Sequence, residues 1–475
     1  MNILTSLYTE TVGVEPQKIE ELPTAGSNRR YYRLIGDKTL VGVIGTCIEE
    51  NRAFIQLARH FRSKGLPVPE VVAVTSDETA YLQEDLGDVQ LFNAIQKGRI
   101  TRSFGPDEKE VLVKTIRLLP DLQFNGATGL DFNVCYPSAE FDVRSIMWDL
   151  NYFKYCFLKA TGLEFLEDKL EDDFQTMAKV LMRNQSSTFM YRDFQSRNVM
   201  VRDNGEPWFI DFQGGRKGPF YYDVASFLWQ AKANFPDSLR HDLIKEYIDS
   251  LRRYIPVDED YFHEQLRHFV LFRTLQVLGA YGFRGYFEKK PHFMQSVPFA
   301  IANLRTLLER SYPEYPYLSK LLHELVEMKQ FSDELEQRSL TVKVMSFAYK
   351  KGIPNDTSGN GGGFVFDCRA VNNPGKYERY KPFTGLDQQV ITFLEEDGEV
   401  LDFLSHAQAL VDASVKRYME RGFTNLMVSF GCTGGQHRSV YCAQHIAEHI
   451  NKEFNVKVEL IHREQNIEQT FKPRR

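Results

Sequence analysis

The chain has 475 residues, of which 43% are hydrophobic and 26% charged, the proportions of an ordinary globular protein. This length predicts two or three domains, each large enough to bury a core. The formal net charge of −6 argues against a general nucleic-acid binder, although residues 341–475 are near neutral, with 17 Lys+Arg and 16 Asp+Glu.

Membrane-spanning and secreted proteins are not expected, because the sequence lacks their features. No run reaches the ~18 apolar residues of a membrane span, and the first ten residues lack the basic start and apolar core of a secretory signal. The six cysteines are scattered without a C-x-x-C pair, which favours reduced thiols over a disulfide framework or a zinc site. We therefore expect a cytoplasmic protein with no membrane segment.

Residues 1–88 predict a small lobe built on β-strands. Leu4–Tyr8 leads into a loop, and strands are expected at 31–34 and 40–44. The loop contains one glycine and a polar run that could lay backbone N–H groups over phosphates, as in kinases: Gly26, Ser27, Asn28, Arg29 and Arg30. An ordinary hairpin loop is the alternative.

The second of these strands lacks a residue that protein kinases have there. It reads Leu-Val-Gly-Val-Ile, with no lysine to pair with the α- and β-phosphates of ATP. Either Arg29 or Arg30 substitutes for that lysine, or ATP is bound without it.

An amphipathic helix is expected at 49–64, followed by strands at 71–75 and 80–83. The last strand enters the acidic turn 84–88, as a kinase hinge would, and adenine would bind there near Glu84 and Leu86. A plain acidic loop is the alternative. Residues 89–325 then predict a large, mostly helical lobe.

The strongest functional signal is the stretch Y-R-D-F-Q-S-R-N-V-M-V-R-D-N-G-E-P-W-F-I-D at 191–211. Asp193 and Asn198 stand five residues apart, and Asp211 follows a short apolar run. Two short strands at 199–202 and 207–210, joined by an Asp-Asn-Gly turn, would hold Asn198 and Asp211 at the base of one hairpin. In kinases, one Asp accepts the proton of the attacking hydroxyl, and an Asn and a later Asp hold magnesium.

Residues 20–310 resemble the aminoglycoside phosphotransferase/choline kinase superfamily, and within it the bacterial kinases of N-acetylmuramate and N-acetylglucosamine. The resemblance is carried by G-S-N-R-R-Y-Y-R-L (26–34), L-P-V-P-E-V (66–71), Q-E-D-L-G-D (83–88), Y-R-D-F-Q-S-R-N-V-M (191–200), I-D-F-Q-G (210–214), G-P-F-Y-Y-D-V-A-S-F-L (218–228) and R-T-L-Q-V-L-G-A-Y-G (273–282). It implies a bilobal α+β kinase using ATP and Mg²⁺, with Asp193 as base and Asn198 and Asp211 on magnesium.

The chain departs from this superfamily at two positions. Tyr191 stands where the family usually has His, and Gln213 replaces the last Gly of D-F-G. We expect the first change to be structural, and the second to mark a site that does not switch as a protein kinase does.

Two further acids lie near this region of the sequence. Asp223 precedes a predicted helix at 224–231, where it would be an N-cap; the resemblance implies that it also braces the catalytic loop. Asp149 lies on a predicted helix, either pointing into an acceptor cleft or solvated.

Beyond a polar linker at 326–340, the pattern changes to a separate layered α/β domain at 341–466. Strands are expected at 341–347, 364–367, 425–429 and 456–461, and helices at 388–394, 400–421 and 440–451. Residues 467–475 form a short basic tail. Near-neutral charge gives little support for RNA binding by this part of the chain.

The loop F-G-C-T-G-G-Q-H-R-S at 430–439 joins a strand to a helix and predicts an anion site. Its glycines let the backbone approach a phosphate, and Arg438 and Ser439 stand at the helix start. A tight turn with a buried cysteine is one alternative. Another is a phosphatase-like C-x5-R loop, in which Cys432 would be a thiolate nucleophile.

Residues 341–465 are similar to the C-terminal domain of the RapZ family of RNase adapters. The motifs are S-F-A-Y-K-K-G-I-P, F-V-F-D-C-R-A-V-N-N-P, P-F-T-G-L-D and F-G-C-T-G-G-Q-H-R-S-V-Y. The resemblance implies glucosamine-6-phosphate sensing, homo-oligomers and binding of a small RNA. By position, the phosphosugar pocket would be Asp367, Arg369, Thr433, Gly434, Gly435, His437, Arg438 and Ser439. The P-loop kinase in front of this domain in RapZ is absent, and a Gly-rich insertion at 358–363 alters the loop before Asp367.

The sequence thus predicts an ATP-dependent kinase of an N-acetylated amino sugar in cell-wall metabolism, fused to a phosphosugar sensor. The alternative is a nucleotide-binding RNA adapter without kinase activity.

Overall fold

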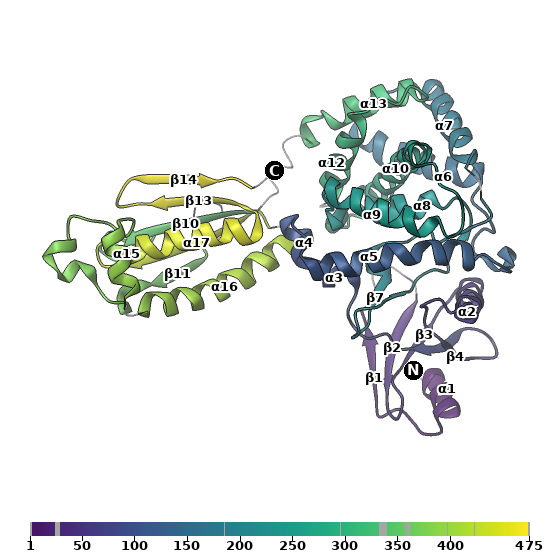
Figure 1. Cartoon of the computed structure of the whole chain (residues 1–475), viewed down its shortest axis with the longest axis horizontal. Helices are drawn as coiled ribbons and strands as arrows, with labels where there is room; N and C mark the ends of the chain where they lie inside the picture. The colour runs from purple at the N-terminus through teal and green to yellow at the C-terminus, as the bar shows by residue number, and fades with distance from the viewer. Residues whose placement is uncertain are drawn as a thin grey trace. The chain divides into compact units, whose positions relative to one another are not determined.

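The computed structural model describes residues 2–23, 29–184, 186–294, 296–331, 340–356, 358, 362–396, 398–421 and 423–473. The chain divides into two compact units, 1–99 with 103–328 and 100–102 with 329–475. Figure 1 shows both units and labels most of their elements. Among the described residues, no helix combines the length and apolarity needed to cross a membrane.

The N-terminal lobe is an antiparallel sheet in the order β1-β2-β3-β5-β4. Its strands are β1 Lys18–Leu22, β2 Arg30–Ile35, β3 Leu40–Ile44, β4 Val71–Val74 and β5 Ala80–Glu84. Helix α1 (Asn2–Val12) packs on β4 and β5, and α2 (Ile48–Ser63) packs on β4. A small core joins α1 to the sheet through Leu4, Tyr8, Leu34 and Leu82.

Two elements of this lobe were not predicted. A loop was expected after Leu4–Tyr8, but α1 runs from Asn2 to Val12, and β1 precedes the expected strands. The run Lys-Ile-Glu-Glu-Leu of β1 lacks an apolar alternation, because this edge strand has no fully buried residue. Its pairing with β2 stabilises it instead.

The larger lobe is mainly helical. Its helices are α3 Leu91–Ala94, α4 Gln96–Thr101, α5 Pro106–Pro120, α6 Val143–Phe153, α7 Glu167–Met182, α8 Tyr221–Leu228, α9 Asp237–Leu251, α10 Glu259–Gly282, α11 Pro291–Met294, α12 Val297–Leu308 and α13 Pro316–Val326. Helix α10 packs against α6, α8 and α12 and forms the centre of the lobe (Figure 1).

Two pairs of short strands position the stretch 191–211 in this lobe. β7 (Val199–Val201) pairs with β8 (Pro207–Phe209), so that Val199 faces Phe209, as the sequence predicts to within a residue. Gly205 in the turn has φ 76°, which favours glycine. β6 (Phe189–Met190) pairs with β9 (Arg216–Lys217).

The C-terminal unit contains a five-stranded sheet in the order β11-β12-β10-β13-β14. The strands β10 (Thr341–Ala348), β11 (Phe364–Asp367), β12 (Asn425–Cys432) and β13 (Lys457–His462) are parallel, and β14 (Ile467–Phe471) runs antiparallel to β13. The helices of this unit are α15 (Gln388–Glu395), α16 (Glu399–Arg421) and α17 (Arg438–Phe454). Helix α17 packs on β10, β12 and β13 (Figure 1).

The predicted basic tail is wrong for its first five residues, which form β14. Ile467 and Phe471 flank three polar side chains, too weak a pattern to indicate a strand. The exposed backbone edge of β13 gives this segment its partner, and Ile461 pairs with Glu468.

Candidate functional site

The loop 191–198, which is the predicted catalytic loop, and the β7–β8 hairpin bring Asp193, Asn198 and Asp211 together. The Asn198 side-chain amide donates to the carbonyl oxygen of Asp193 at 2.9 Å, and the Ile210 N–H donates to the carbonyl of Asn198 at 3.0 Å. Asp211 follows directly, in a left-handed conformation with φ 66°. Such strain in a non-glycine residue is typical of functional sites.

Tyr191 and Gln213, the two departures from the superfamily pattern, both support this arrangement. The Tyr191 hydroxyl donates to the carbonyl of Ile210, at the base of the hairpin. The Gln213 amide donates to Asp211 Oδ1 at 2.7 Å.

The two aspartates of the site have different surroundings. The Asp193 side chain is 53% exposed, and its Oδ1 lies 3.8 Å from Arg273 Nη2. The pKa of Asp211 is raised, because surrounding protein atoms limit its hydration and the Asp193 carboxylate repels its negative charge. Bringing a cation to the pair would relieve this repulsion.

Asp223 is fully buried and holds the catalytic loop from beneath. It accepts hydrogen bonds from the N–H groups of Tyr191 and Arg192, both at 2.9 Å, and from Gln123 at 3.2 Å. Burial raises its pKa to about 7, against the effect of these donors. The predicted N-cap role is wrong: α8 begins at Tyr221 rather than 224, with Phe220 as its N-cap, so Asp223 lies in the first turn.

A polar chain runs from Asp211 to the start of the sheet. Gln213 links Asp211 to Glu50 of α2 at 3.4 Å, and Glu50 lies 3.5 Å from Arg29 Nη2. Arg29 is buried, whereas Arg30 is exposed. Of the two arginines considered as replacements for the strand lysine, Arg29 therefore lies toward the site. Ser27 and Asn28 lie outside the described residues.

The predicted hinge follows β5. The Glu84 N–H donates to the carbonyl of Glu70, and its carboxylate pairs with Arg202 at 3.0 Å. Leu86 is buried, and Asp85 pairs with Arg33 at 2.6 Å. The acidic turn is therefore held in place by ion pairs rather than left as a free loop.

Asp149 of α6 is shielded from solvent and has polar partners, which the sequence did not predict. It accepts from Gln276 at 2.7 Å and lies 3.4 Å from Arg192 Nη2. Gln276 and Arg273 lie on α10, more than a hundred residues further along the chain. Only the quoted R-T-L-Q-V-L-G-A-Y-G motif pointed to them.

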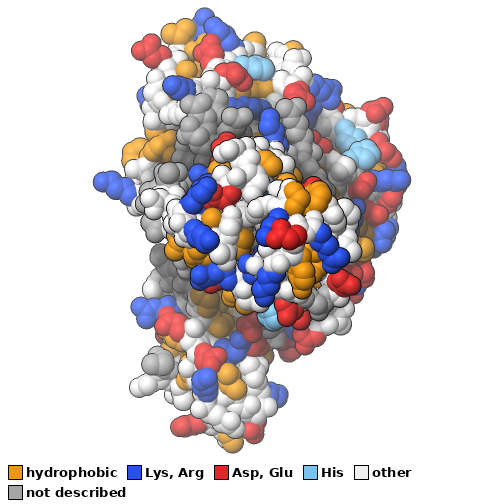
Figure 2. Space-filling view, turned by 90° about the vertical axis from the view of Figure 1, so that its left-hand side faces the viewer, with side chains coloured by type: hydrophobic (Ala, Val, Ile, Leu, Met, Phe, Trp, Pro, Cys, Tyr) orange, Lys and Arg blue, Asp and Glu red, His pale blue; other side chains and the backbone are white. Residues whose placement is uncertain are grey.

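In the C-terminal unit, a pocket of about 400 Å³ lies where β12 ends and α17 begins. It is lined by Asn373, Gly375, Lys381, Cys432, Thr433, Gly434, Gln436, His437 and Arg438. Ligands of parallel α/β sheets commonly bind at this carboxyl edge. In Figure 2, where this unit faces the viewer, lysine and arginine side chains are spread over the surface.

Four of the eight predicted phosphosugar residues line this pocket: Thr433, Gly434, His437 and Arg438. Asp367 and Arg369 instead form an exposed ion pair at 2.6 Å, and Ser439 and the Gly435 N–H both contact the Cys432 thiol, at 3.1 and 3.2 Å. Asn373 and Gln436 stand inside the motifs quoted above, and Gly375 and Lys381 stand directly beside them, but none of the four was predicted to line the pocket.

Arg438 and Cys432 give this pocket its chemistry. Arg438 Nη1 donates to the carbonyls of Arg369 and Val371 at 2.9 and 2.8 Å, and its buried Nε has no hydrogen-bond partner among the described residues. Burial disfavours the Cys432 thiolate, but hydrogen bonds from Ser439 and Gly435 outweigh it and lower the pKa of this thiol.

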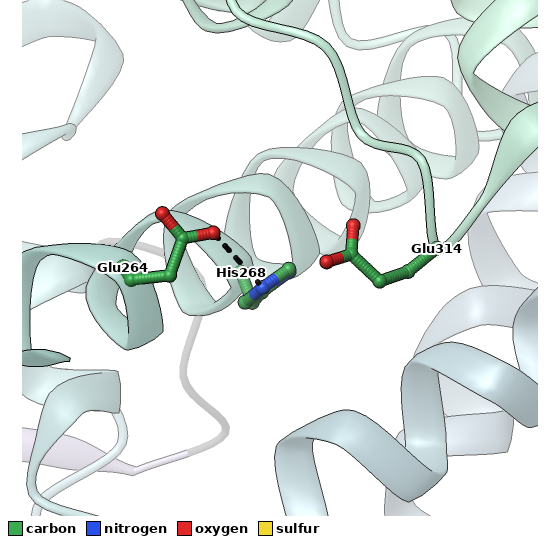
Figure 3. Close-up of side chains that lie close together, drawn as sticks. All are labelled: Glu264, His268 and Glu314. Carbon is green, nitrogen blue, oxygen red and sulfur yellow. Dashed lines mark ion pairs between the residues drawn. The ribbon is translucent and has the colours of Figure 1, made fainter.

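A cluster outside both sites consists of Glu264, His268 and Glu314, whose donor atoms lie within 4.8 Å of one another (Figure 3). Glu264 pairs with Arg310 and with Arg267, and His268 Nδ1 lies 3.0 Å from the Tyr315 hydroxyl. Because Glu264 already has two cationic partners, we assign no ligand to this cluster.

Models of two known protein families match this chain. A model described as the phosphotransferase enzyme family matches residues 18–257, just over half of the chain. The chain belongs to this family. Its N-terminal unit is accordingly placed among phosphotransferases with an alcohol group as acceptor. A second model, described as the RapZ C-terminal domain, matches residues 340–466.

Curated relatives match only part of the chain. A nucleotide-binding protein of Bacillus cytotoxicus is 37% identical over 139 residues, which is 29% of this chain and 45% of that protein. One of Fervidobacterium nodosum is 35% identical over 139 residues, 29% of this chain and 48% of that protein. The chain thus spans about half the length of the curated relatives it matches.

The chain is also similar to solved structures at low sequence identity. The GDP and kanamycin complex of APH(2")-IIia has a TM-score of 0.46 at 13% identity, covering 64% of this chain and 99% of that chain. Choline kinase LicA from Streptococcus pneumoniae has a TM-score of 0.46 at 12% identity, covering 65% and 99%.

Proposed function

We propose that the N-terminal unit transfers the γ-phosphate of ATP to a hydroxyl of an N-acetylated amino sugar of cell-wall metabolism, as in peptidoglycan recycling. The observation that supports this most is the convergence of Asp193, Asn198 and Asp211 at the base of one hairpin. Their order and types are those of kinase sites.

Asp193 is the proposed base. Its carboxylate is half-exposed, so that an acceptor hydroxyl can approach it, and Arg273 Nη2 lies 3.8 Å from its Oδ1. Accepting the proton as the hydroxyl attacks would make the oxygen a better nucleophile.

Asn198 and Asp211 are the proposed magnesium ligands, and their free atoms fit that ion. Asn198 uses its amide nitrogen for Asp193, which leaves its side-chain oxygen available. Asp211 binds Gln213 through Oδ1, which leaves Oδ2. Magnesium prefers such oxygen donors, and when bound it would neutralise charge on the β- and γ-phosphates.

Arg29 is the proposed substitute for the missing strand lysine. Its pairing with Glu50 of α2 parallels the lysine–glutamate pair of protein kinases, and Gln213 extends the connection to Asp211. Ser27, Asn28 and Arg30 complete the proposed phosphate loop, and Glu84 and Leu86 the adenine side. Asp223 supports the catalytic loop from below.

For the C-terminal unit, we propose binding of a phosphosugar such as glucosamine-6-phosphate. The buried Arg438 Nε, which has no hydrogen-bond partner in the part of the chain that the structure describes, supports an anion in the 400 Å³ pocket, and the start of α17 adds its dipole. His437 and Lys381 line the same pocket. A homo-oligomer formed through this unit belongs to the same proposal.

A second candidate is a nucleotide-binding RNA adapter without kinase activity. The lysine-free strand β3 favours it, and the intact Asp193, Asn198 and Asp211 set opposes it. An adapter would bind RNA with an affinity that falls steeply with salt concentration.

The deciding experiment is phosphoryl transfer from ATP–Mg to N-acetylated hexosamines, muramate sugars and aminoglycosides, with products identified by mass spectrometry. We expect transfer to an amino sugar and a loss of at least about 100-fold in Asp193→Asn, since a positioned base contributes that much or more. Asp203→Asn, in the exposed hairpin turn, is the matched control. Silence across the panel, with ATP still bound, would favour the adapter.

A further inference from the structure

Three arginines surround the single carboxylate of Asp149 beside the proposed base. Arg192 Nη2 lies 3.4 Å from both Asp149 oxygens. Arg273 reaches Asp149 through Gln276, to which its Nη1 donates at 2.7 Å. Arg216, at the start of β9, completes the set, since its charge and those of Arg192 and Arg273 all act on Asp149. The four residues come from the catalytic loop, α6, α10 and β9.

Two guanidinium groups in this set have unsatisfied donors. Arg192 Nη1 and Arg216 Nε are buried and have no hydrogen-bond partner among the described residues. Arg216 is only 4% exposed, and Arg192 adopts φ 74°. Burying an unpaired donor on a charged group is costly, and left-handed strain in a non-glycine residue adds to that cost. Such features persist where a ligand completes the site.

The cluster has more positive than negative charges and lies beside Asp193, the proposed base. The three guanidinium groups carry three positive charges, and the carboxylates of Asp149 and Asp193 carry two negative ones. The nearby Asp223 is not counted with them, because both of its oxygens already accept backbone N–H groups. The side chains of Arg192 and Arg273 are 22% and 15% exposed, so that a ligand can reach them. Arg273 Nη2 lies 3.8 Å from the proposed base.

We propose that the acceptor carries an anionic group, a carboxylate or a phosphate, which is bound by Arg192 and Arg273, with the charge of the buried Arg216 behind them, while its hydroxyl faces Asp193. This inference rests on the kinase activity proposed above and specifies its substrate class. An arginine pair can bind either anion in bidentate fashion. A polycationic aminoglycoside would meet like charge at the same place.

The electrostatics of the cluster agree with this assignment. Burial and the neighbouring Arg192 charge lower the pKa of Arg216 to about 10, so that a bound anion would stabilise its charged form. Burial raises the pKa of Asp149 despite three nearby arginines, so this carboxylate is a poor counter-charge for them.

The test compares a neutral amino sugar, two anionic derivatives of the same sugar and a cationic aminoglycoside. Binding of N-acetylglucosamine, N-acetylmuramate, N-acetylglucosamine-6-phosphate and kanamycin to the full chain with a non-hydrolysable ATP analogue is measured by calorimetry, and transfer from ATP is measured in parallel. We expect at least one of the two anionic sugars to bind about 10-fold or more tightly than N-acetylglucosamine, and kanamycin not to be phosphorylated. The carboxylate and phosphate arms distinguish the two anions.

Arg192→Gln and Arg273→Gln are the test variants, and Arg144→Gln, an exposed arginine of α6, is the control. Each test variant should reduce the ratio of the affinities for the anionic and the neutral sugar about 10-fold. If the arginines had only a structural role, their loss would weaken the binding of both kinds of sugar equally. Sensitivity to Arg192→Gln also assigns phosphate-sugar binding to this site rather than to the C-terminal pocket.

Equal binding of neutral and anionic sugars, or a ratio unchanged in both variants, overturns the anionic acceptor whether or not transfer occurs. Selective anion binding without any transfer supports the inference on substrate class and contradicts the proposed kinase activity. The two proposals therefore fail separately.

Discussion

Single side chains decide how firmly the catalytic loop is held, and Asp223 is the clearest case. It lies fully buried under the loop and accepts the N–H groups of two consecutive residues, Tyr191 and Arg192. Arg192 is also strained, with φ 74°. Asp223 therefore stabilises a conformation that the loop would otherwise leave.

The stability of the N-terminal unit should depend on pH through Asp223. Its pKa of about 7 in the folded protein exceeds the ~3.9 of an unfolded chain, so between these values only the folded state holds the proton. The free energy of unfolding should therefore fall as pH rises from about 4 to 7, by up to about 1.4 kcal/mol per unit. Asp223→Asn should lack this contribution, and its stability relative to wild type should improve across that window.

Urea unfolding followed by tryptophan fluorescence measures this effect in one unit, because all three tryptophans, Trp148, Trp208 and Trp229, lie in the N-terminal unit. Asp168→Asn, at an exposed acid, is the matched control. Parallel pH profiles for Asp223→Asn and wild type would contradict the assignment.

Contacts between site residues could be predicted from the sequence only where the residues are close together in the chain. The spacing of Asp193, Asn198 and Asp211 around a turn signal was enough, because a short hairpin fixes the geometry of its ends. It was not enough for Arg273 and Gln276. They meet Asp149 only because α10 packs against α6, and helix packing has no local signature.

Elements with strong periodicity were predicted to within a few residues, and weak or edge elements were not. The parallel strands β10 and β12 and the helices α2 and α16 follow the expected ranges. The edge strands β1 and β14 were missed because each is stabilised by backbone pairing along one side rather than by a buried apolar face. Asp223 was misplaced as a cap for a related reason: α8 begins three residues early, at an aromatic pair that the core buries.

The junction of β12 and α17 gives a prediction for the C-terminal pocket. Lys381 lines the pocket together with Arg438 and His437, and its side chain is exposed enough to be replaced without disturbing the core. Lys381→Met should weaken binding of glucosamine-6-phosphate about 10-fold, the effect of one hydrogen bond to a charged group. Calorimetry with this sugar phosphate and with inorganic phosphate measures the change.

Lys376→Met is the control, since Lys376 lies on the same loop, is exposed and does not line the pocket. An equal loss in both variants would mean that general positive charge, rather than the pocket, attracts the anion. No loss in Lys381→Met would place the phosphate elsewhere.

For the whole molecule, the proposals for the two units concern one kind of metabolite. A kinase acting on an amino sugar makes a phosphosugar, and the C-terminal pocket is proposed to bind a phosphosugar. Ligand binding at one site changes activity at another only if the ligand distinguishes between two states of the protein. We hypothesise that occupancy of the pocket reports cell-wall precursor levels to the kinase.

Glucosamine-6-phosphate should then change the rate of phosphoryl transfer at saturation, by about fivefold or more if the coupling is of ordinary size. The kinase rate of the full chain is measured against increasing glucosamine-6-phosphate, at a fixed concentration of the acceptor. Lys381→Met should shift the half-effective concentration upward by the same factor as it weakens binding, without changing the rate in the absence of the ligand. This parallel shift separates action through the pocket from competition at the acceptor site, which Lys381→Met would leave untouched. A rate unaffected at saturation would show that the two units work independently.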